Sequence, residues 1–394
     1  MTAQQKKSAL GLMVMAIFFV ALNLRPAISS IGPMLEIIRV DLELSNSEVS
    51  LLTSIPVFCM GLFAPLAVVF NKRFGMKRSV SLLVGVIGAL TFVRGLMPSY
   101  AVLIISSFFI GLAIAIISPL ISAMIKRNFP TRTTALIGVY SFGLGLGATL
   151  STGLTGVFYT WTNWPLALAS WGVLAIIALI LWFRVNEPRT EGVDDELIGG
   201  RGTSPWRNRR AWYMLVFFGF QSALFFSLIT WLAPIAIDKG MGVLTAGAVL
   251  TVMTSVQLIG NLSIPALLEK FPSRLFWILV SLLFGAAGIG LLMLGHPAFI
   301  WIAAICLGFT LGGLFPIALL MPLDENERAD DVNSWTAMIQ GGGYIISSMM
   351  PFSIGFFYDR YGTHDLTLIL FMGYIAILAL LAILLNNKKL PDHP

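Results

Sequence analysis

A single arginine lies deep inside the first long apolar segment of this chain. Arg25 stands about 15 residues into a run that begins near residue 10, which places it roughly 22 Å along a helix that rises 1.5 Å per residue. The other apolar segments hold no clear Asp, Glu, Lys or His near their centres, so Arg25 has no obvious carboxylate partner. A guanidinium stays charged and presents a planar fork of donors, which suits an oxyanion or another electron-rich ligand.

Two interpretations of Arg25 remain open. In the one we favour, Arg25 faces a central cavity and supplies the counter-charge for a ligand. In the other, it is a structural residue that extends outward to the membrane surface or is satisfied by helix-end carbonyls. Pro26 follows directly, removes a backbone donor and loosens the helix. Nearby carbonyls and the amide of Asn23 can then join a site around the guanidinium.

Buried amides and aromatic side chains supply the remaining candidates. Gln257 and Gln340 lie at membrane depth, where an unpaired amide costs several kcal/mol. We expect them to face the cavity, with interhelical hydrogen bonding as the alternative. Tyr344 follows Gln340 by four residues, so the two share a helix face. The predicted ligand-binding residues are Arg25, Asn23, Tyr140, Gln221, Gln257, Gln340 and Tyr344.

Three further residues have interpretations that do not involve a ligand. Trp231 and Trp335 lie near the ends of apolar segments, where a place in the interfacial aromatic belt is at least as good as a place in a cavity wall. Arg94 lies late in its segment. We expect it to extend its charged head to the membrane surface, with attraction of anions toward an outer vestibule as the alternative.

Catalytic constellations are missing from the sequence. No Ser, His and Asp grouping, metal-ligand spacing or phosphate-binding loop occurs, and the glycines at 341–343 lie within an apolar run rather than after a strand. Cys59 and Cys306 both lie inside apolar segments and indicate neither a metal site nor a disulfide framework. We therefore expect no enzymatic activity and no cofactor.

The composition is that of a membrane protein. Hydrophobic residues make up 57% of the 394 and charged residues only 11%, with a mean hydropathy of +0.87. Soluble domains carry roughly 25% charged residues. Apolar stretches of about 20 residues, each long enough to cross a bilayer as a helix, predict spans at 10–34, 48–70, 79–97, 101–124, 134–158, 164–184, 212–236, 243–268, 275–295, 298–322, 333–357 and 366–386.

Loop cations set the expected orientation. The net charge is +6 and the pI near 9.4, but the excess Lys and Arg lie in short loops, which argues against a nucleic-acid partner. With a cytoplasmic N-terminus, only Arg39, Arg94, Lys239 and Arg360 fall on or near the outer side. The positive-inside rule then predicts a multi-pass protein of the bacterial inner (plasma) membrane with both termini cytoplasmic.

The chain divides into two similar halves. We expect an N-terminal six-helix bundle at 1–184, a cytoplasmic linker at 185–211 and a C-terminal six-helix bundle at 212–394. Gly and Pro stand eight residues apart at 111 and 119, and again at 308 and 316. Two structural repeats of this kind place a site between them near the membrane midplane.

Several segments resemble the cyanate-permease and nitroimidazole-transporter branch of the major facilitator superfamily. They are NLRPAISSIGPML (23–35), RFGMKRS (73–79), IKRNFP (125–130), GGLFPIALLMPLD (312–324) and MIQGGGYI (338–345). The resemblance implies an all-α membrane fold of 12 helices in two pseudo-symmetric bundles, and a monomer. Lys72 departs from the acidic residue of the family's G-x-x-x-D-R-x-G-R loop, whereas Glu269 keeps the corresponding place in the second half.

These features predict a secondary active or facilitated transporter that works by alternating access in the lipid bilayer. We expect it to carry a small anion or a planar polar heteroaromatic, cyanate- or nitroimidazole-like, with Arg25 as anchor and the glutamines as hydrogen-bonding partners. Proton-driven multidrug efflux is the alternative, although it usually needs an embedded acidic residue. A membrane enzyme would need a catalytic constellation, and a sensor or scaffold would need soluble domains; we find neither in this sequence.

Overall fold

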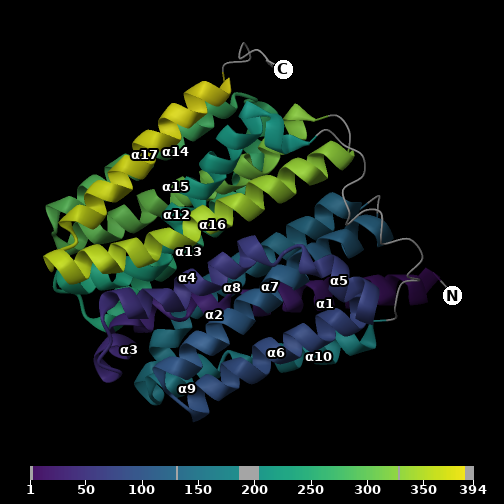
Figure 1. Ribbon diagram of the computed structural model, residues 1–394, viewed down its shortest axis with the longest axis horizontal. Helices are drawn as coiled ribbons and strands as arrows, with labels where there is room; N and C mark the ends of the chain where they lie inside the picture. Colours follow the sequence, from purple (N-terminus) through teal and green to yellow (C-terminus); the bar gives the residue numbers. More distant parts are fainter. Residues whose placement is uncertain (1–2, 130–131, 186–203, 327–328, 387–394) are drawn as a thin grey trace.

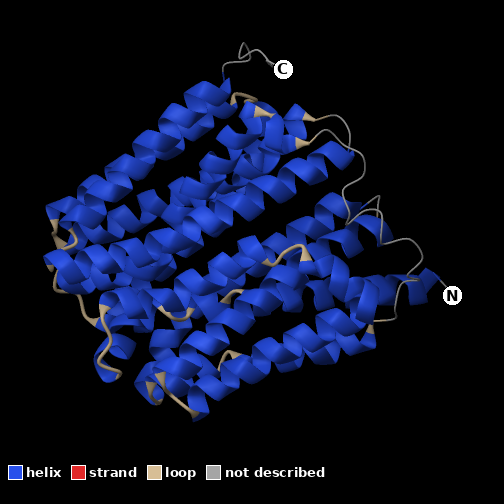
Figure 2. Cartoon of the chain, in the orientation of Figure 1, coloured by secondary structure: helices blue, strands red, loops and turns tan. Residues whose placement is uncertain are grey.

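The computed structural model describes residues 3–129, 132–185, 204–326 and 329–386, and these residues form helices without any strand (Figure 2). The helices make two bundles that lie side by side (Figure 1). Most of the predicted linker, residues 186–203, lies outside the described residues.

The first bundle contains the helices up to Arg184. Their bounds are α1 (Ala3–Leu24), α2 (Pro26–Ser29), η1 (Gly32–Met34), α3 (Leu35–Asp41), α4 (Asn46–Leu62), α5 (Leu66–Phe74), α6 (Met76–Leu96), α7 (Tyr100–Asn128), α8 (Thr133–Trp161), α9 (Trp164–Ala169) and α10 (Gly172–Arg184). The second bundle contains η3 (Pro205–Arg207), α12 (Arg209–Asp238), α13 (Val243–Lys270), α14 (Arg274–Leu294), α15 (Pro297–Glu325), α16 (Ala329–Tyr361) and α17 (Asp365–Asn386).

Twelve spanning units agree with the expected fold. Among the described residues, 10 helical segments are long and apolar enough to cross a membrane, and the bent pair α4 and α5 makes an eleventh. The twelfth is α16, whose 33 residues make it about 50 Å long. It is more polar than the others because it lies between α4 and α12.

Prolines interrupt two of the predicted spans. The first span is interrupted after Leu24, where Pro26 begins the short α2. The second bends by 72° between α4 and α5, and Pro65 is the N-cap residue of α5. Since proline lacks an N–H and its ring clashes with the preceding turn, a helix does not run straight through it.

The two bundles meet at one end of the molecule, which we call the α3 end because it carries α3, the beginning of α4 and the end of α16 (Figure 1). Here the core is continuous between bundles, since Ile31, Met34 and Leu52 belong to one buried cluster with Ile229 and Leu250. At this end a Cβ on Gly355 of α16 would lie 2.5 Å from the Asn46 carbonyl oxygen of α4, and farther along the same pair of helices a Cβ on Gly61 would lie 2.6 Å from the Gly341 carbonyl oxygen.

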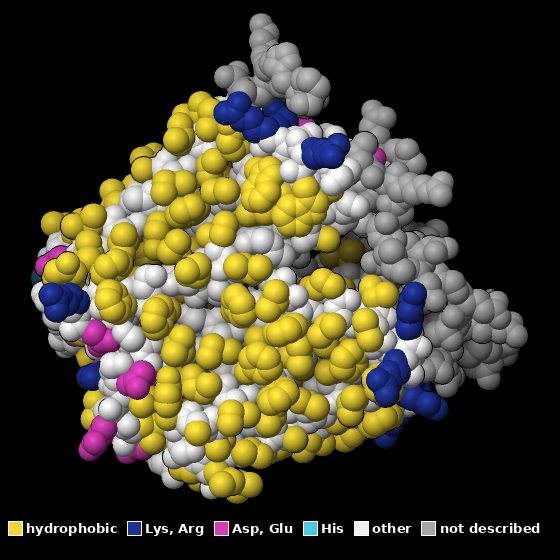
Figure 3. Space-filling model, in the orientation of Figure 1, with side chains coloured by type: hydrophobic (Ala, Val, Ile, Leu, Met, Phe, Trp, Pro, Cys, Tyr) yellow, Lys and Arg dark blue, Asp and Glu magenta, His cyan; other side chains and the backbone are white. Residues whose placement is uncertain are grey.

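At the opposite end α1 begins and α17 ends, and here the bundles separate. Beyond Gly61, α5 turns away and packs on α6 and α7 of its own bundle. On α8, Gly145 still faces Leu258 of α13, whereas a Cβ on Gly138 would meet nothing within 4 Å. Figure 3 shows a hollow between the bundles toward this end. The described structure is therefore closed at the α3 end and open at the other.

Candidate functional site

The helix break places Arg25 between α1 and α2. Arg25 is the N-cap residue of α2, and its carbonyl accepts hydrogen bonds from the N–H groups of Ile28 and Ser29 at 3.0 and 2.9 Å. Pro26 occupies the first position of α2, where no helical N–H is needed. The expectation that Pro26 interrupts the helix beside Arg25 is confirmed, and the arginine projects from the discontinuity.

The guanidinium of Arg25 faces the other bundle. Its Cζ lies 5.8 and 5.9 Å from the ring centroids of Phe225 and Phe226 on α12, and the half-exposed side chain also interacts with Tyr344 of α16. Tyr140 of α8 also lies within electrostatic range of the Arg25 guanidinium. Aromatic faces attract a cation without neutralising it.

No carboxylate of the described chain pairs with Arg25. Ion pairs in residues 3–129, 132–185, 204–326 and 329–386 include those of Arg39 with Glu36, Arg210 with Glu325, Arg274 with Asp324 and, when protonated, His364 with Asp238, and none of these reaches Arg25. The guanidinium therefore has no carboxylate counter-ion among these residues.

An aromatic wall surrounds the guanidinium. The ring of Tyr344 packs edge-on against Phe218 and Phe226, with centroids 5.3 and 6.3 Å apart, and it contacts the buried clusters of both bundles. Sequence reasoning missed Phe225 and Phe226 because it looked for side chains with a polar group, namely acids, amides, tyrosines and tryptophans. The available signal was spacing, since Phe225 follows Gln221 by one helical turn.

The predicted amides differ in their relation to Arg25. Asn23 is 3% exposed and its Nδ2 has no hydrogen-bond partner in the described structure. Gln221 is buried on α12 and donates to Ser222 Oγ at 3.1 Å. Gln340 is half-buried one turn before Tyr344, whereas Gln257 is half-buried on α13 with its backbone packed against Gly312. The structure thus brings Arg25, Tyr140 and Tyr344 together and leaves Gln257 without a visible link to them.

Arg94, Trp231 and Trp335 are all buried in the structure, whereas the sequence suggested places near the membrane surface for them. Arg94 is only 1% exposed, so the expected surface position is wrong, and its partners are Ser106, Ser107 and Ala27. Trp231 is also 1% exposed and donates to the Pro351 carbonyl at 2.9 Å, so it packs α12 against α16 rather than facing the membrane interface. Trp335 is buried too.

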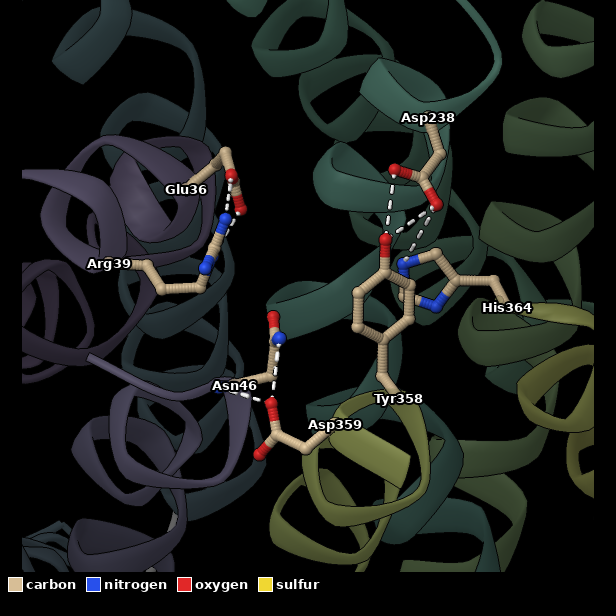
Figure 4. A network of polar contacts seen from close by, with 7 residues as sticks. All are labelled: Glu36, Arg39, Asn46, Asp238, Tyr358, Asp359 and His364. Carbon is tan, nitrogen blue, oxygen red and sulfur yellow. Dashed lines mark hydrogen bonds and ion pairs between the residues drawn. The ribbon is translucent and has the colours of Figure 1, made fainter. Parts of the chain in front are cut away.

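Polar contacts close the α3 end (Figure 4). Asp359 of α16 accepts from the N–H groups of Asn46 and Ser47 at the first turn of α4, each at 2.8 Å. Beside it, Tyr358 donates to Asp238 at 3.1 Å. Deeper in the interface, Thr230 donates to Thr53 across the bundles at 2.9 Å.

The chain belongs to the major facilitator superfamily of membrane transporters, whose family model matches residues 12–348. The expected family and the absence of an enzymatic role are confirmed. Three solved structures with a similar fold illustrate the match. The nucleoside transporter NupG has a TM-score of 0.76 at 12% identity, covering 96% of this chain and 99% of that one.

A bacterial homologue of the human lysosomal transporter Spinster shows the same fold in two inward-facing structures, one occupied and one unoccupied. Their TM-scores are 0.71 and 0.74, at 18% and 15% identity, each covering 100% of this chain and 99% of the other. At these identities the similarity demonstrates the fold alone.

Curated relatives are more similar in sequence. The cyanate transport protein CynX of Escherichia coli is 33% identical over 87% of this chain and 89% of its own. The 2-nitroimidazole transporter of Escherichia coli is 28% identical over 94% of this chain and 93% of its own. The uncharacterized transporter YycB of Bacillus subtilis is 29% identical over 90% of this chain and 88% of its own. The predicted branch of the superfamily is thereby confirmed.

Proposed function

We propose that this transporter carries a small anion or a planar polar heteroaromatic, and that Arg25 binds it between the two bundles. The observation that supports this most is the unpaired guanidinium of Arg25, which projects from a helix break toward Phe225, Phe226 and Tyr344. A charge-assisted hydrogen bond from Arg25 would hold an oxyanion or a nitro group, and the aromatic rings would accommodate a flat ligand.

Alternating access supplies the transport cycle. The state described here is closed at the α3 end, so the ligand enters and leaves through the opposite end. Rocking of one bundle against the other would separate α4 from α16 and expose Arg25 to the α3 end instead. We place both termini in the cytoplasm because Lys and Arg gather at the end where α1 begins, whereas Asp and Glu gather at the α3 end (Figure 3).

Proton-driven multidrug efflux remains the second candidate. A driving proton would need an embedded acidic group, and no Asp or Glu of the described residues contacts Arg25. We therefore rank it below a small-ligand carrier. Relatives that are named for cyanate and 2-nitroimidazole transport favour the same order.

A ligand-stabilisation screen tests the proposal. Purified protein is heated with cyanate, nitrite, formate, 2-nitroimidazole or ethidium, and the apparent melting temperature is recorded. A ligand at about 100 times its Kd stabilises by about 2.7 kcal/mol. We expect stabilisation by at least one small planar compound in the wild type and none in an Arg25→Gln variant. Stabilisation by ethidium alone would favour multidrug efflux.

A further inference from the structure

A second arginine lies entirely inside the first bundle. Arg94 of α6 is 1% exposed and donates three hydrogen bonds. Its Nε contacts Ser106 Oγ at 2.8 Å, its Nη2 contacts Ser107 Oγ at 2.9 Å, and its Nη1 contacts the Ala27 carbonyl oxygen at 2.8 Å. One side chain therefore joins α6 to α7 and to the short α2.

All three acceptors of Arg94 are neutral. None of the ion pairs in the described parts of the chain includes it. A cation without a counter-ion is costly to keep inside a membrane bundle, where such residues mark functional elements by default. Packing alone would be served as well by an apolar side chain of similar size.

The contact with Ala27 uses a carbonyl that is free because α2 ends after Ser29, and α2 begins at the break beside Arg25. In a regular helix the Ala27 carbonyl would accept from the N–H of Ile31, but that N–H contacts the Ile28 carbonyl at 3.3 Å instead. Ala27 is two residues from Arg25, so a group that fixes the Ala27 carbonyl also fixes the segment from which Arg25 projects.

We propose that Arg94 is a positioning residue of the ligand site, which holds the broken segment by its Ala27 carbonyl and so aims Arg25 between the bundles. This inference rests on the proposed function, because it assigns Arg94 a role only through Arg25. A planar fork suits the task, since it reaches two hydroxyls on α7 and one carbonyl on α2 in a single geometry.

A double-mutant cycle separates this role from a purely structural one. Binding of cyanate, nitrite, formate and 2-nitroimidazole is measured on the full-length wild type, Arg94→Gln, Arg25→Lys, which should retain weakened binding, and the double variant. We expect Arg94→Gln to weaken binding at least tenfold, and to weaken it no further once Arg25 is replaced. Independent effects that multiply in the double variant would overturn the positioning role.

Arg94→Lys keeps the test valid if Arg94→Gln does not fold. Lysine retains the charge but not the fork, so binding should weaken at least threefold in a protein whose ligand-free melting temperature is close to that of the wild type. Wild-type affinity in Arg94→Lys would overturn the inference. If Arg25→Gln loses binding while both Arg94 variants bind fully, the positioning role of Arg94 is overturned and the proposed function stands. If no probe binds the wild type, the proposed function is overturned as well.

Discussion

The carboxylate of Asp359, near the end of α16, accepts a hydrogen bond from the backbone N–H of Asn46 at the first residue of α4, at 2.8 Å. The same carboxylate reaches the N–H of Ser47 and the side chains of both residues. It thereby caps the positive end of a helix that belongs to the other bundle. This contact joins the halves at the α3 end and must break before that end opens.

Replacing Asp359 should loosen the closed end. Asp359→Ala removes a helix cap, which typically contributes about 1 kcal/mol. We expect a severalfold rise in the rate at which a maleimide labels a cysteine placed at Thr53, in a background without Cys59 and Cys306. Asp365→Ala is the matched control, since this exposed carboxylate lies at the same end without a bond between bundles. Equal labelling in all three proteins would contradict the closing role of Asp359.

Gly61 tests the contact between α4 and α16. Because a Cβ there would lie 2.6 Å from the Gly341 carbonyl oxygen, Gly61→Leu prevents the close approach of α4 and α16 between the bundles. We expect uptake into proteoliposomes to fall at least tenfold. Gly85→Leu should stay within about twofold of the wild type, since nothing lies within 4 Å of a Cβ at Gly85. Similar rates for both variants would argue against this interface as a moving one.

Phe225 tests the aromatic side of the site. Its ring faces the Arg25 guanidinium at 5.8 Å, and such contacts contribute about 0.5–2 kcal/mol. Phe225→Leu should therefore weaken ligand binding about two- to thirtyfold, whereas Phe225→Trp should retain it. A titration of ligand against apparent melting temperature measures both. If Phe225→Leu binds the ligand as tightly as the wild type, the ring of Phe225 takes no part in the site.

The acid sensitivity of the fold should depend on His364. This residue lies between α16 and α17, is 5% exposed and stacks on Tyr358 with ring centroids 4.3 Å apart. Burial, and then the charge of Lys239, lower the pKa of His364 to about 3, while Asp238 lies 3.8 Å from its Nε2. An unfolded histidine has a pKa of about 6.5.

Between these two pKa values the folded protein binds fewer protons than the unfolded chain. The part of the folding stability that depends on neutral His364 is therefore fully present above about pH 6.5 and is lost as the pH falls toward 3. We expect the apparent melting temperature to drop between pH 7 and pH 5, and to drop less in His364→Asn. The exposed His296 offers a control, since His296→Asn should keep the wild-type pH dependence. The same drop in His364→Asn as in the wild type would refute this assignment.

Local signals in the sequence were enough for the fold and for Arg25. Apolar stretches of about 20 residues predicted the spans. Pro26 predicted the break beside the arginine, because proline disrupts the helix within one turn of itself. The partners of Arg25 could not be found in this way. Phe225 and Phe226 lie about 200 residues away on α12, and only the packing of the two bundles brings them to the guanidinium.

Arg94 shows the opposite kind of error. Its place late in an apolar segment suggested a side chain that reaches the membrane surface. The acceptors that keep it inside are serines of the following helix and a carbonyl that is free because the short α2 ends after Ser29. Neither the hydroxyl pair nor the free carbonyl could be recognised as a partner until α2, α6 and α7 were placed together.

Counterflow of radiolabelled cyanate or 2-nitroimidazole into proteoliposomes tests the central claim most directly, with wild type, Arg25→Lys and Arg25→Ala compared at equal incorporation. We predict flux in the wild type, reduced flux in Arg25→Lys, and background in Arg25→Ala, although the Arg25→Ala protein remains folded in the membrane. Undiminished flux through Arg25→Ala would contradict the account, because the ligand would then cross without the guanidinium.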